Sequence, residues 1–331
     1  MANIIEQTKE IRKIWSAYQS SRVLITANNF RVFDYLEKPM TAGTLAKKIK
    51  TDCRATEILL DALAGTGLLK KQKDRYKNTS LASRLLVHGK PLYQGDIIRH
   101  AEHMWRSWSH LDAAMKTGKP SGGKRDHESF ILGMHNLSVL KVKDIVKEID
   151  LAGVRTALDL GGGPGTYSIE LAKKGIQVTL FDTPETIKLA KRVINNSPQS
   201  PLRLRGGEGG VKKNISFIQG DFLHDDIGTG YDLIFVSQIL HAYSDKDNMS
   251  LLRKCRKALN SSGRVVVQEF LIDESRTKPV QGALFAINML VNTDGGRTYS
   301  PGEMKRWMLK TGFKDVDHKM VADGVLVRGK K

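Results

Sequence analysis

The stretch from Ala157 to Thr166 constrains the fold of this chain more than any other. It reads Ala-Leu-Asp-Leu-Gly-Gly-Gly-Pro-Gly-Thr, so an apolar run reaches Asp159 and Leu160 and then breaks into glycines. A pattern that suits a helix follows at once, with Tyr167, Ile169, Leu171 and Ala172. Strand, Gly-rich turn and helix in this order open a nucleotide-type βαβ unit. Glycine lets a ligand approach the backbone closely, and we expect free N–H groups at the helix start to hold an anionic group.

The spacing of these glycines separates two classes of ligand. In the dinucleotide pattern Gly-x-Gly-x-x-Gly, counted from Gly161, the third position is Thr166. The better match is Asp-x-Gly-x-Gly-x-Gly, formed by Asp159, Gly161, Gly163 and Gly165. A second apolar run, Ile176–Phe181, ends in Asp182. An acid at the end of the second strand is where a ribose diol is held, so the two motifs together indicate a nucleoside ligand; the alternative is a plain strand–turn–helix.

The composition describes an ordinary globular chain with an unusual charge. No apolar run approaches the roughly 20 residues that cross a bilayer, and the charges within Met1–Trp15 argue against a signal peptide. Cys53 and Cys255 form no metal or disulfide pattern, so we expect a reducing cytoplasm. The formal charge of +18 indicates either general solvation or a surface for nucleic acid, membrane or acidic small molecules. Solvation is favoured because the bases are scattered, the main tract being Arg203–Lys213 in a predicted surface loop over Ser197–Lys213.

The first 92 residues predict a small helical domain with a hairpin. We expect helices over residues 1–20, Arg22–Tyr35 and Arg54–Gly65, a short helix capped by Thr41, and a hairpin around Lys73-Asp74. Helix, helix, hairpin is a winged-helix pattern, which in DNA-binding proteins uses the second helix for recognition. Here that helix carries one base and two acids among mainly apolar or small side chains. Packing or dimerisation is therefore favoured over DNA binding.

Residues 93–150 read as further helices that carry large apolar side chains. A cluster is formed by Tyr93, Met104, Trp105, Trp108 and Met115, and the next helix, beginning near His127, adds Phe130 and Met134. Such side chains belong either to a core or to the wall of a pocket for a flat apolar substrate.

Residues 151–331 change to alternating strands and helices, which predicts an α/β domain. Strands are expected at Arg155–Leu160, Ile176–Phe181, Ile215–Gln219, Tyr231–Ser237, Arg264–Phe270, Lys314–Met320 and Gly324–Arg328. Helices are expected at Thr166–Lys174, Glu185–Val193, Asp245–Leu259 and Pro301–Gly312.

Polar side chains follow the third, fourth and fifth strands of this series. Asp221 and Phe222 come after the third, where an acid accepts from an exocyclic amine and an aromatic ring lies against a base; the alternative for Asp221 is a solvated loop acid. His241 follows the fourth strand, where a neutral imidazole accepts a proton from a substrate hydroxyl. Glu269 closes the fifth, and its carboxylate is placed to bind the other imidazole nitrogen and raise its basicity. A structural histidine is the alternative.

These motifs together resemble the plant caffeic-acid and hydroxyindole type of S-adenosylmethionine-dependent O-methyltransferase and its bacterial small-molecule relatives. The resemblance covers nearly the whole chain. Its pieces are Leu158-Asp-Leu-Gly-Gly-Gly-Pro-Gly, Phe181-Asp182, Gly220-Asp221-Phe222, Leu240-His241-x-Tyr-Ser-Asp, Gly263–Glu269, Gly295-Gly-Arg-Thr and Thr311-Gly-Phe313, with Trp108 and Phe130-x-x-x-Met134 upstream. The resemblance implies a Rossmann-like sheet of seven strands in a class I methyltransferase domain, preceded by a winged-helix-like dimerisation domain, and hence a homodimer.

The resemblance also implies an activity and roles for named residues. A methyl group of S-adenosylmethionine passes to a hydroxyl of an aromatic or polycyclic small molecule, leaving S-adenosylhomocysteine, with His241 as general base, Glu269 as its orienting partner and no metal. Cofactor-binding candidates are Asp159, Gly161, Gly163, Asp182, Asp221, Phe222 and Ser237, and substrate-binding candidates are Trp108, Phe130, Met134, Met289 and Arg297.

Two departures from the family pattern keep alternatives open. Ala242 follows the histidine where the family often has Asp, and Arg297 and Thr298 stand where a second Glu is expected. Arg297 suits either an anionic group of the substrate or surface acids. The alternatives to O-methylation are methylation of carbon or another atom on the same fold and, resting only on charge and the winged-helix outline, a non-catalytic regulator that binds nucleic acid.

Overall fold

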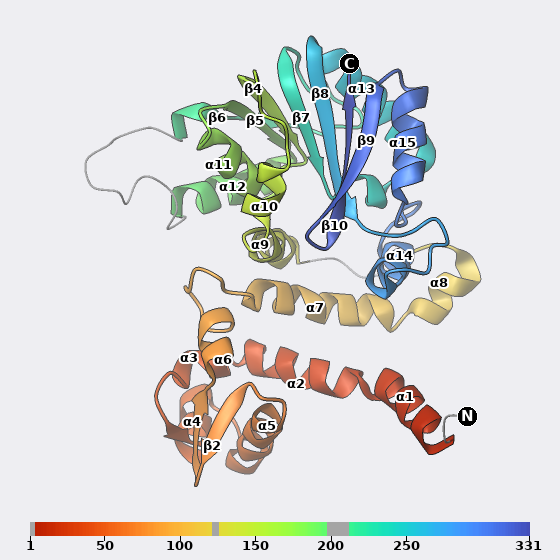
Figure 1. Ribbon diagram of the computed structural model, residues 1–331. Coiled ribbons are helices and arrows are strands. Elements are labelled where there is room, and N and C mark those ends of the chain that lie inside the picture. The colour runs from red at the N-terminus through yellow and green to blue at the C-terminus, as the bar shows by residue number, and fades with distance from the viewer. Residues whose placement is uncertain (1–3, 121–125, 197–211) are drawn as a thin grey trace. The chain divides into compact units, whose positions relative to one another are not determined.

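A computed structural model describes residues 4–120, 126–196 and 212–331 (Figure 1). Most of the predicted basic loop over 197–213 therefore lies outside the described residues. The chain divides into two compact units, Met1–Glu102 and His103–Lys331, and each is described by itself.

The first unit contains short helices and a three-stranded sheet. Its elements are α1 (Ile4–Ser16), α2 (Tyr18–Asn29), α3 (Val32–Tyr35), β1 (Met40–Thr41), α4 (Ala42–Ile49), α5 (Cys53–Gly65), β2 (Leu69–Gln72), β3 (Arg75–Asn78), α6 (Ser80–Leu85) and most of α7 (Gly95–Trp108). Strand order is β1-β3-β2. The predicted hairpin is confirmed, and so is the Thr41 cap, whose side chain accepts from the Thr44 amide.

Two predicted helices of this unit are wrong in their extent. The helix expected over residues 1–20 ends at Ser16, and α2 begins at Tyr18. The expected helix over Arg22–Tyr35 is interrupted, because Arg31 adopts a left-handed backbone conformation with φ of 53°. α2 therefore ends at Asn29, and a separate turn of helix, α3, begins at Val32. The break turns Val32 and Phe33 into the core, where they are buried with Leu45, Leu60 and Leu63.

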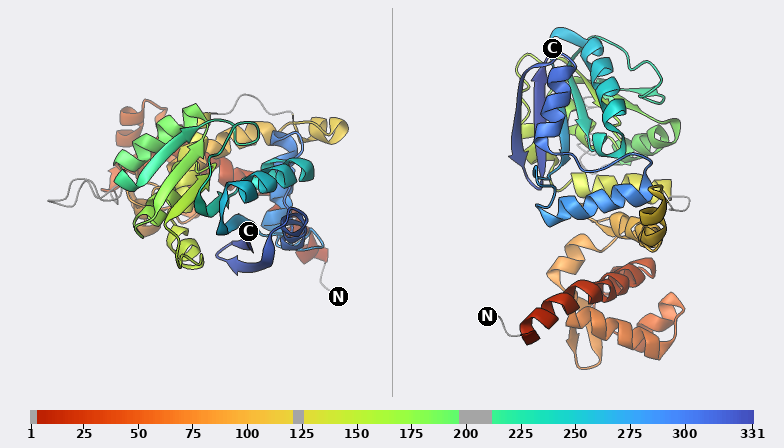
Figure 2. Two further views of the ribbon diagram at one scale, coloured as in Figure 1. Left: turned by 90° about the horizontal axis from the view of Figure 1, so that it is seen from above. Right: turned by 90° about the vertical axis from the view of Figure 1, so that its right-hand side faces the viewer.

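The second unit is built on a seven-stranded sheet in the order β6-β5-β4-β7-β8-β10-β9 (Figures 1 and 2). Its strands are β4 (Thr156–Leu160), β5 (Gln177–Asp182), β6 (Ile215–Gln219), β7 (Tyr231–Ser237), β8 (Leu259–Phe270), β9 (Lys314–Val321) and β10 (Gly324–Lys330). Strands β4 to β8 pair in parallel, and β10 is antiparallel to both of its neighbours. The seven predicted strands are confirmed, although β8 begins five residues earlier than expected.

Helices cover both faces of this sheet, as alternating apolar residues of the strands require. Leu158, Ile234 and Val267 face α13 (Asp245–Ala258) and α15 (Pro301–Lys310), whereas Ala157 and Leu233 face the other layer. That other layer contains α10 (Val142–Lys147), α11 (Thr166–Ala172) and α12 (Pro184–Asn196). Three further helices complete the unit: α8 (Leu111–Thr117), α9 (His127–Ser138) and α14 (Val280–Asn292), the last of which the sequence analysis did not predict.

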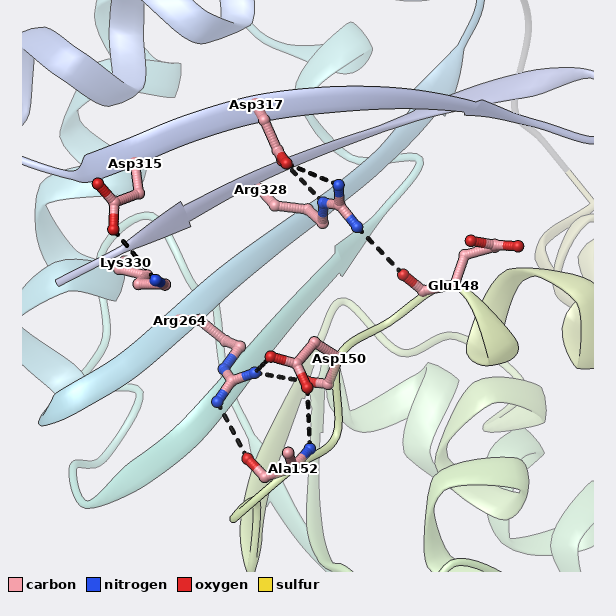
Figure 3. A network of polar contacts seen from close by, with 8 residues as sticks. All are labelled: Glu148, Asp150, Ala152, Arg264, Asp315, Asp317, Arg328 and Lys330. Carbon is pink, nitrogen blue, oxygen red and sulfur yellow. Dashed lines mark hydrogen bonds and ion pairs between the residues drawn. The ribbon is translucent and has the colours of Figure 1, made fainter.

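The segment that leads from α10 into β4 is tied to the sheet by ion pairs (Figure 3). The Arg264 guanidinium binds the Asp150 carboxylate and donates to the Ala152 carbonyl at 3.1 Å. Arg328 on β10 binds both oxygens of Asp317 on β9, at 2.8 and 2.7 Å, and donates to the Glu148 carbonyl at 3.4 Å. These contacts join β8, β9 and β10 to the chain entering β4, on the side remote from the carboxyl ends of the parallel strands.

Candidate functional site

The glycine loop follows β4 and has a backbone that only glycine adopts without strain. Gly161, Gly163 and Gly165 all have positive φ, and a Cβ on Gly161 would lie 2.4 Å from the Ile239 side chain. The free N–H groups were predicted at the start of the following helix, and the amides of the loop itself donate within the protein. The Gly161 and Gly162 amides donate to the Phe181 carbonyl, and the Gly163 amide donates to Asp182 Oδ2 at 2.9 Å. These amides instead hold the loop against the end of β5.

Asp182 ends β5 beside this loop, and both of its carboxylate oxygens accept backbone hydrogen bonds. Besides the Gly163 amide on Oδ2, the Thr183 amide donates to Oδ1 at 2.7 Å. Burial raises the pKa of Asp182, and these hydrogen bonds oppose that rise. Each carboxylate oxygen has a second lone pair, so the group has capacity for two more donors such as the hydroxyls of a ribose.

Asp159 lies behind the loop and is fully buried. Its Oδ2 accepts from the Ser168 hydroxyl at 2.6 Å, which ties β4 to α11, whereas its Oδ1 has no hydrogen-bond partner. Burial is the main cause that raises the pKa of Asp159 to about 6, and the nearby Asp182 charge contributes. A buried acid with one unpaired oxygen is costly, so it fits a role toward a cationic ligand group.

Phe222 lies beside the glycine loop, whereas Asp221 turns back into its own loop. A Cβ on Gly161 would be 3.4 Å from the Phe222 ring, and that ring meets Tyr243 edge to face at 5.7 Å. Asp221 accepts from the Leu223 amide and from His224, whose hydrogen bond is the main cause of the lowered pKa of Asp221. The Lys254 ammonium group holds this loop by donating to the carbonyls of Phe222, Leu223 and Asp225 at 2.8 to 2.9 Å.

His241 and Glu269 meet as the spacing predicts. His241 Nδ1 lies 2.7 Å from Glu269 Oε2, and the His241 amide donates to Glu269 Oε1 at 3.3 Å. The imidazole is 12% exposed and the carboxylate 3%, so the pair is shielded from water on most sides. Phe285 of α14 meets the imidazole edge to face at 4.9 Å. A carboxylate on Nδ1 fixes the tautomer that leaves the Nε2 lone pair as a proton acceptor.

The segment after α14 presses against the backbone that carries this histidine. A Cβ on Gly296 would lie 2.3 Å from the His241 carbonyl oxygen. Glycine is required at 296 because any side chain would displace His241. Arg297 lies over the Tyr299 ring at 5.9 Å, and the Thr298 hydroxyl donates to the Gly282 carbonyl. Thr298 therefore anchors the segment to the start of α14.

The remaining predicted residues are distributed around this end of the sheet. Trp108 donates its indole N–H to Asn288 on α14 at 3.0 Å, next to the buried Met289. Phe130 and Met134 are half-buried on α9, and Ser237 donates to the Gln268 side chain at 2.7 Å. In Figure 1, α9 and α14 lie beyond the carboxyl ends of the strands.

Sequence reasoning missed two asparagines of α14. Asn288 accepts from Trp108 and from the Asn292 amide group at 3.1 Å, so the two form a polar patch on a helix without charged residues. Two asparagines spaced four apart in an apolar run were the available signal, because that spacing places them on one helix face. In the part of the chain that the structure describes, neither a helix that could cross a membrane nor a cluster of three or more metal-ligating residues is present.

Comparison with known proteins places both units in one family. A model of the O-methyltransferase domain matches residues 108–314, and a model of the O-methyltransferase dimerisation domain matches residues 13–88. A 3-hydroxy-5-methyl-1-naphthoate 3-O-methyltransferase of Streptomyces sahachiroi is 32% identical over 83% of this chain and 80% of its own length. A tetracenomycin polyketide synthesis 8-O-methyl transferase of Streptomyces glaucescens is 30% identical, over 93% of this chain and 91% of its own length.

A solved structure shows the same fold at lower identity. The human N-acetylserotonin methyltransferase in complex with S-adenosylmethionine superposes with a TM-score of 0.86 at 24% identity, covering 98% of this chain and 97% of that chain. The domain match and the two bacterial relatives carry the assignment beyond the fold. This chain belongs to the S-adenosylmethionine-dependent O-methyltransferase family.

Proposed function

We propose that this enzyme methylates a hydroxyl group of an aromatic or polycyclic small molecule, with His241 as the general base. The observation that carries the proposal is the 2.7 Å contact between His241 Nδ1 and Glu269 at the carboxyl ends of β7 and β8. The relative of 32% identity is named for 3-O-methylation of a hydroxynaphthoate, which is a hydroxylated aromatic acceptor. The relative of 30% identity is named for an 8-O-methyl transfer in polyketide synthesis.

The residues around the glycine loop fit S-adenosylmethionine. Asp182 has lone pairs for the ribose hydroxyls, Phe222 offers a ring for the adenine, and the unpaired Oδ1 of buried Asp159 suits the ammonium group of the methionine part. We further propose backbone contacts from Gly161 and Gly163, and support from Ser237 and Asp221 at the neighbouring strand ends. When bound, the cofactor supplies an electrophilic methyl group on a sulfonium ion.

The protein itself contributes a general base, orients the acceptor and excludes water from the site. The buried Glu269 carboxylate fixes the imidazole through Nδ1 and stabilises the imidazolium that forms when Nε2 takes the proton of the acceptor hydroxyl. We propose that Trp108, Phe130, Met134 and Met289 hold the flat acceptor, which leaves its oxygen aligned for transfer. Such alignment contributes roughly 7–11 kcal/mol in favourable cases. We propose that Arg297, which lies over the Tyr299 ring, turns to bind an anionic group of the acceptor.

We also propose a homodimer formed through the first unit. The apolar side of α1 and the start of α2 is exposed, with Ile4, Ile5, Ile11, Ile14, Trp15 and Tyr18 each 52–75% accessible. A hollow of about 230 Å³ on the same unit is lined by Val23, Leu24, Leu63 and Leu68, among others. Exposed apolar surface of this extent marks an interaction site. Cys53 and Cys255 form no disulfide, which fits the cytoplasm we propose.

A panel of acceptors tests the activity. The purified chain is incubated with S-adenosylmethionine and hydroxynaphthoates or hydroxylated polycyclic aromatics, and products are identified by mass spectrometry and NMR. An O-methyl ether is expected. A C-methyl product would assign the reaction to the alternative kept open by Ala242 and Arg297, and failure of the chain to bind S-adenosylhomocysteine would remove the function altogether. Size-exclusion chromatography with light scattering tests the dimer.

A further inference from the structure

Helix α9 reaches the cofactor side of the sheet through a histidine that the proposed mechanism does not use. His127, its first residue, places Nε2 3.0 Å from the Thr186 hydroxyl on α12. Thr186 is only 1% exposed, so this hydroxyl exchanges no hydrogen bonds with water. A buried hydroxyl with an imidazole partner is a specific arrangement rather than a surface contact.

The same hydroxyl belongs to a short chain of groups that ends at Asp182. Thr186 Oγ1 lies 2.8 Å from Thr183 Oγ1, and the Thr183 amide donates to Asp182 Oδ1 at 2.7 Å. The Thr183 amide therefore links these hydroxyls to Asp182, and the nearby imidazole of His127 favours the ionised form of Asp182 against the burial that raises its pKa.

The positions of the protons on these hydrogen-bonded side chains determine whether the His127 imidazole donates to Thr186 or accepts from it. A threonine hydroxyl donates one hydrogen bond and accepts two. If His127 Nε2 carries a proton, it donates to Thr186 and leaves the hydroxyl proton of Thr186 for Thr183 Oγ1. If Nε2 accepts instead, the Thr186 proton turns toward the imidazole and Thr183 Oγ1 loses that donor. The first arrangement therefore holds Thr183, whose amide donates to Asp182, more firmly.

We propose that His127 is a positioning residue for the cofactor: by donating Nε2–H to Thr186, it holds the Thr183–Thr186 turn and keeps the Asp182 carboxylate oriented toward the ribose hydroxyls. The inference rests on the proposed role of Asp182. It extends the cofactor site to a helix that precedes the glycine loop in the chain and that sequence motifs do not connect with it.

Helix α9 has other anchors, so the role of His127 is separable from the packing of the helix. His135 Nδ1 lies 2.9 Å from the Thr166 hydroxyl at the start of α11, and Glu128 pairs with Arg192 of α12. Asp126 caps the helix by accepting from the Ser129 amide, and His103 lies 3.8 Å from its carboxylate. These contacts remain when the imidazole of His127 is removed.

Calorimetric titration of the full-length enzyme with S-adenosylhomocysteine tests the proposal. His127→Leu, which cannot donate, is expected to weaken binding about tenfold, near the upper end for the net contribution of a hydrogen bond between uncharged groups. His127→Gln, whose side-chain amide can donate from a similar position, is expected to bind within about twofold of wild type. His318→Leu, an exposed histidine on β9, is the matched control and should not change the affinity.

A double-mutant cycle separates this role from general packing. In an Asp182→Asn background, His127→Leu should change the affinity by less than about twofold, because the carboxylate it supports is gone. Equal losses in both backgrounds, or a His127→Leu enzyme that binds like wild type, would overturn the inference. If His127→Leu does not fold, Thr186→Val removes the same hydroxyl link and should give the same loss. Wild-type enzyme that fails to bind S-adenosylhomocysteine would instead overturn the proposed function.

Discussion

Two buried carboxylates at the carboxyl ends of the seven-stranded sheet differ from two hydrogen-bonded carboxylates at its other end. At the carboxyl ends, Asp159 and Asp182 have pKa values raised chiefly by burial, and no Lys or Arg pairs with either among the ion pairs of the described residues. At the other end, Asp232 accepts from Asn260, Arg155 and Thr156, and these bonds lower its pKa to about 2. The Asp150 carboxylate, bound to Arg264 and the Ala152 amide, also has a lowered pKa.

The direction of the pKa shift separates carboxylates that stabilise the folded state from carboxylates that destabilise it. A carboxylate whose pKa is lowered favours the folded state at neutral pH, whereas one whose pKa is raised disfavours it. Residues that cost stability and lie together at the carboxyl ends of parallel strands are expected where a ligand binds. Carboxylates therefore stabilise the sheet at one end. At the other end, where we propose that the cofactor and the acceptor bind, buried carboxylates without a Lys or Arg partner among the described residues destabilise it.

The largest effect is expected from removing the base at the carboxyl end. His241→Ala should lower kcat roughly 10²–10⁴-fold, because no group is left to take the hydroxyl proton. The affinity for S-adenosylhomocysteine should stay within about twofold, since the imidazole pairs with Glu269 and not with the glycine loop. Steady-state kinetics on an acceptor from the panel and calorimetry measure the two quantities. Full activity in His241→Ala would show that this end contributes binding alone.

The next effect concerns stability and has an unusual sign. The pKa of Asp159 is 3.8 in the unfolded chain, and burial raises it to about 6 in the folded protein. Between these pH values the folded protein holds a proton that the unfolded chain has released, so the free energy of unfolding falls as pH rises from about 4 to 6, by about 3 kcal/mol. Asp159→Asn should remove this slope and raise stability above pH 6, while weakening S-adenosylhomocysteine binding. Urea unfolding at several pH values measures it.

A matched variant at the other end should give the opposite result. The pKa of Asp232 is lowered, so its contribution to stability is present above 3.8 and lost as pH falls toward 2. Asp232→Asn should therefore destabilise the protein at neutral pH without changing cofactor affinity. If Asp159→Asn and Asp232→Asn shifted stability in the same direction, the contrast between the two ends of the sheet would be wrong.

The sequence predicted the active end better than the contacts behind it. Because carboxyl ends of parallel strands converge, the positions of Asp182, His241 and Glu269 after apolar runs were enough to bring them to one edge. The complete burial of Asp159 was not predictable, because it depends on Ser168 and Gly162 packing over it. The pattern of apolar residues in one segment does not show which other segment packs over that segment.

Two further elements were missed for related reasons. Helix α14 has no charged residue and no side-chain cap at Pro279, so the charged face and the start signal that usually identify a helix are both absent. The contact of His127 with Thr186 joins residues 59 positions apart on two helices. Such a contact is set by how α9 packs against α12, which local periodicity does not determine.

A smaller effect is expected where the fold is fastened. Arg264 is 21% exposed and binds Asp150 as well as the carbonyls of Asp150 and Ala152, so Arg264→Met should lower the free energy of unfolding by about 1–2 kcal/mol. Methionine keeps much of the apolar stem, so the loss reports the polar contacts. Binding of S-adenosylhomocysteine should be unchanged. A large loss of affinity in Arg264→Met would mean that the two ends are coupled.

The smallest effect is expected at an exposed ion pair, which serves as a comparison for the partly buried contacts of Arg264. Lys330 lies 3.0 Å from Asp315, but the two side chains are 64% and 69% exposed, so water and salt screen the pair. Lys330→Met should change the free energy of unfolding by no more than about 0.5 kcal/mol, and added salt should leave that difference nearly unchanged. Urea unfolding of Lys330→Met beside Arg264→Met, at low and high salt, makes the comparison. If the two variants lost equal stability, positive charge at this end would account for the stabilisation. The hydrogen bonds from Arg264 to backbone carbonyls would then contribute nothing further.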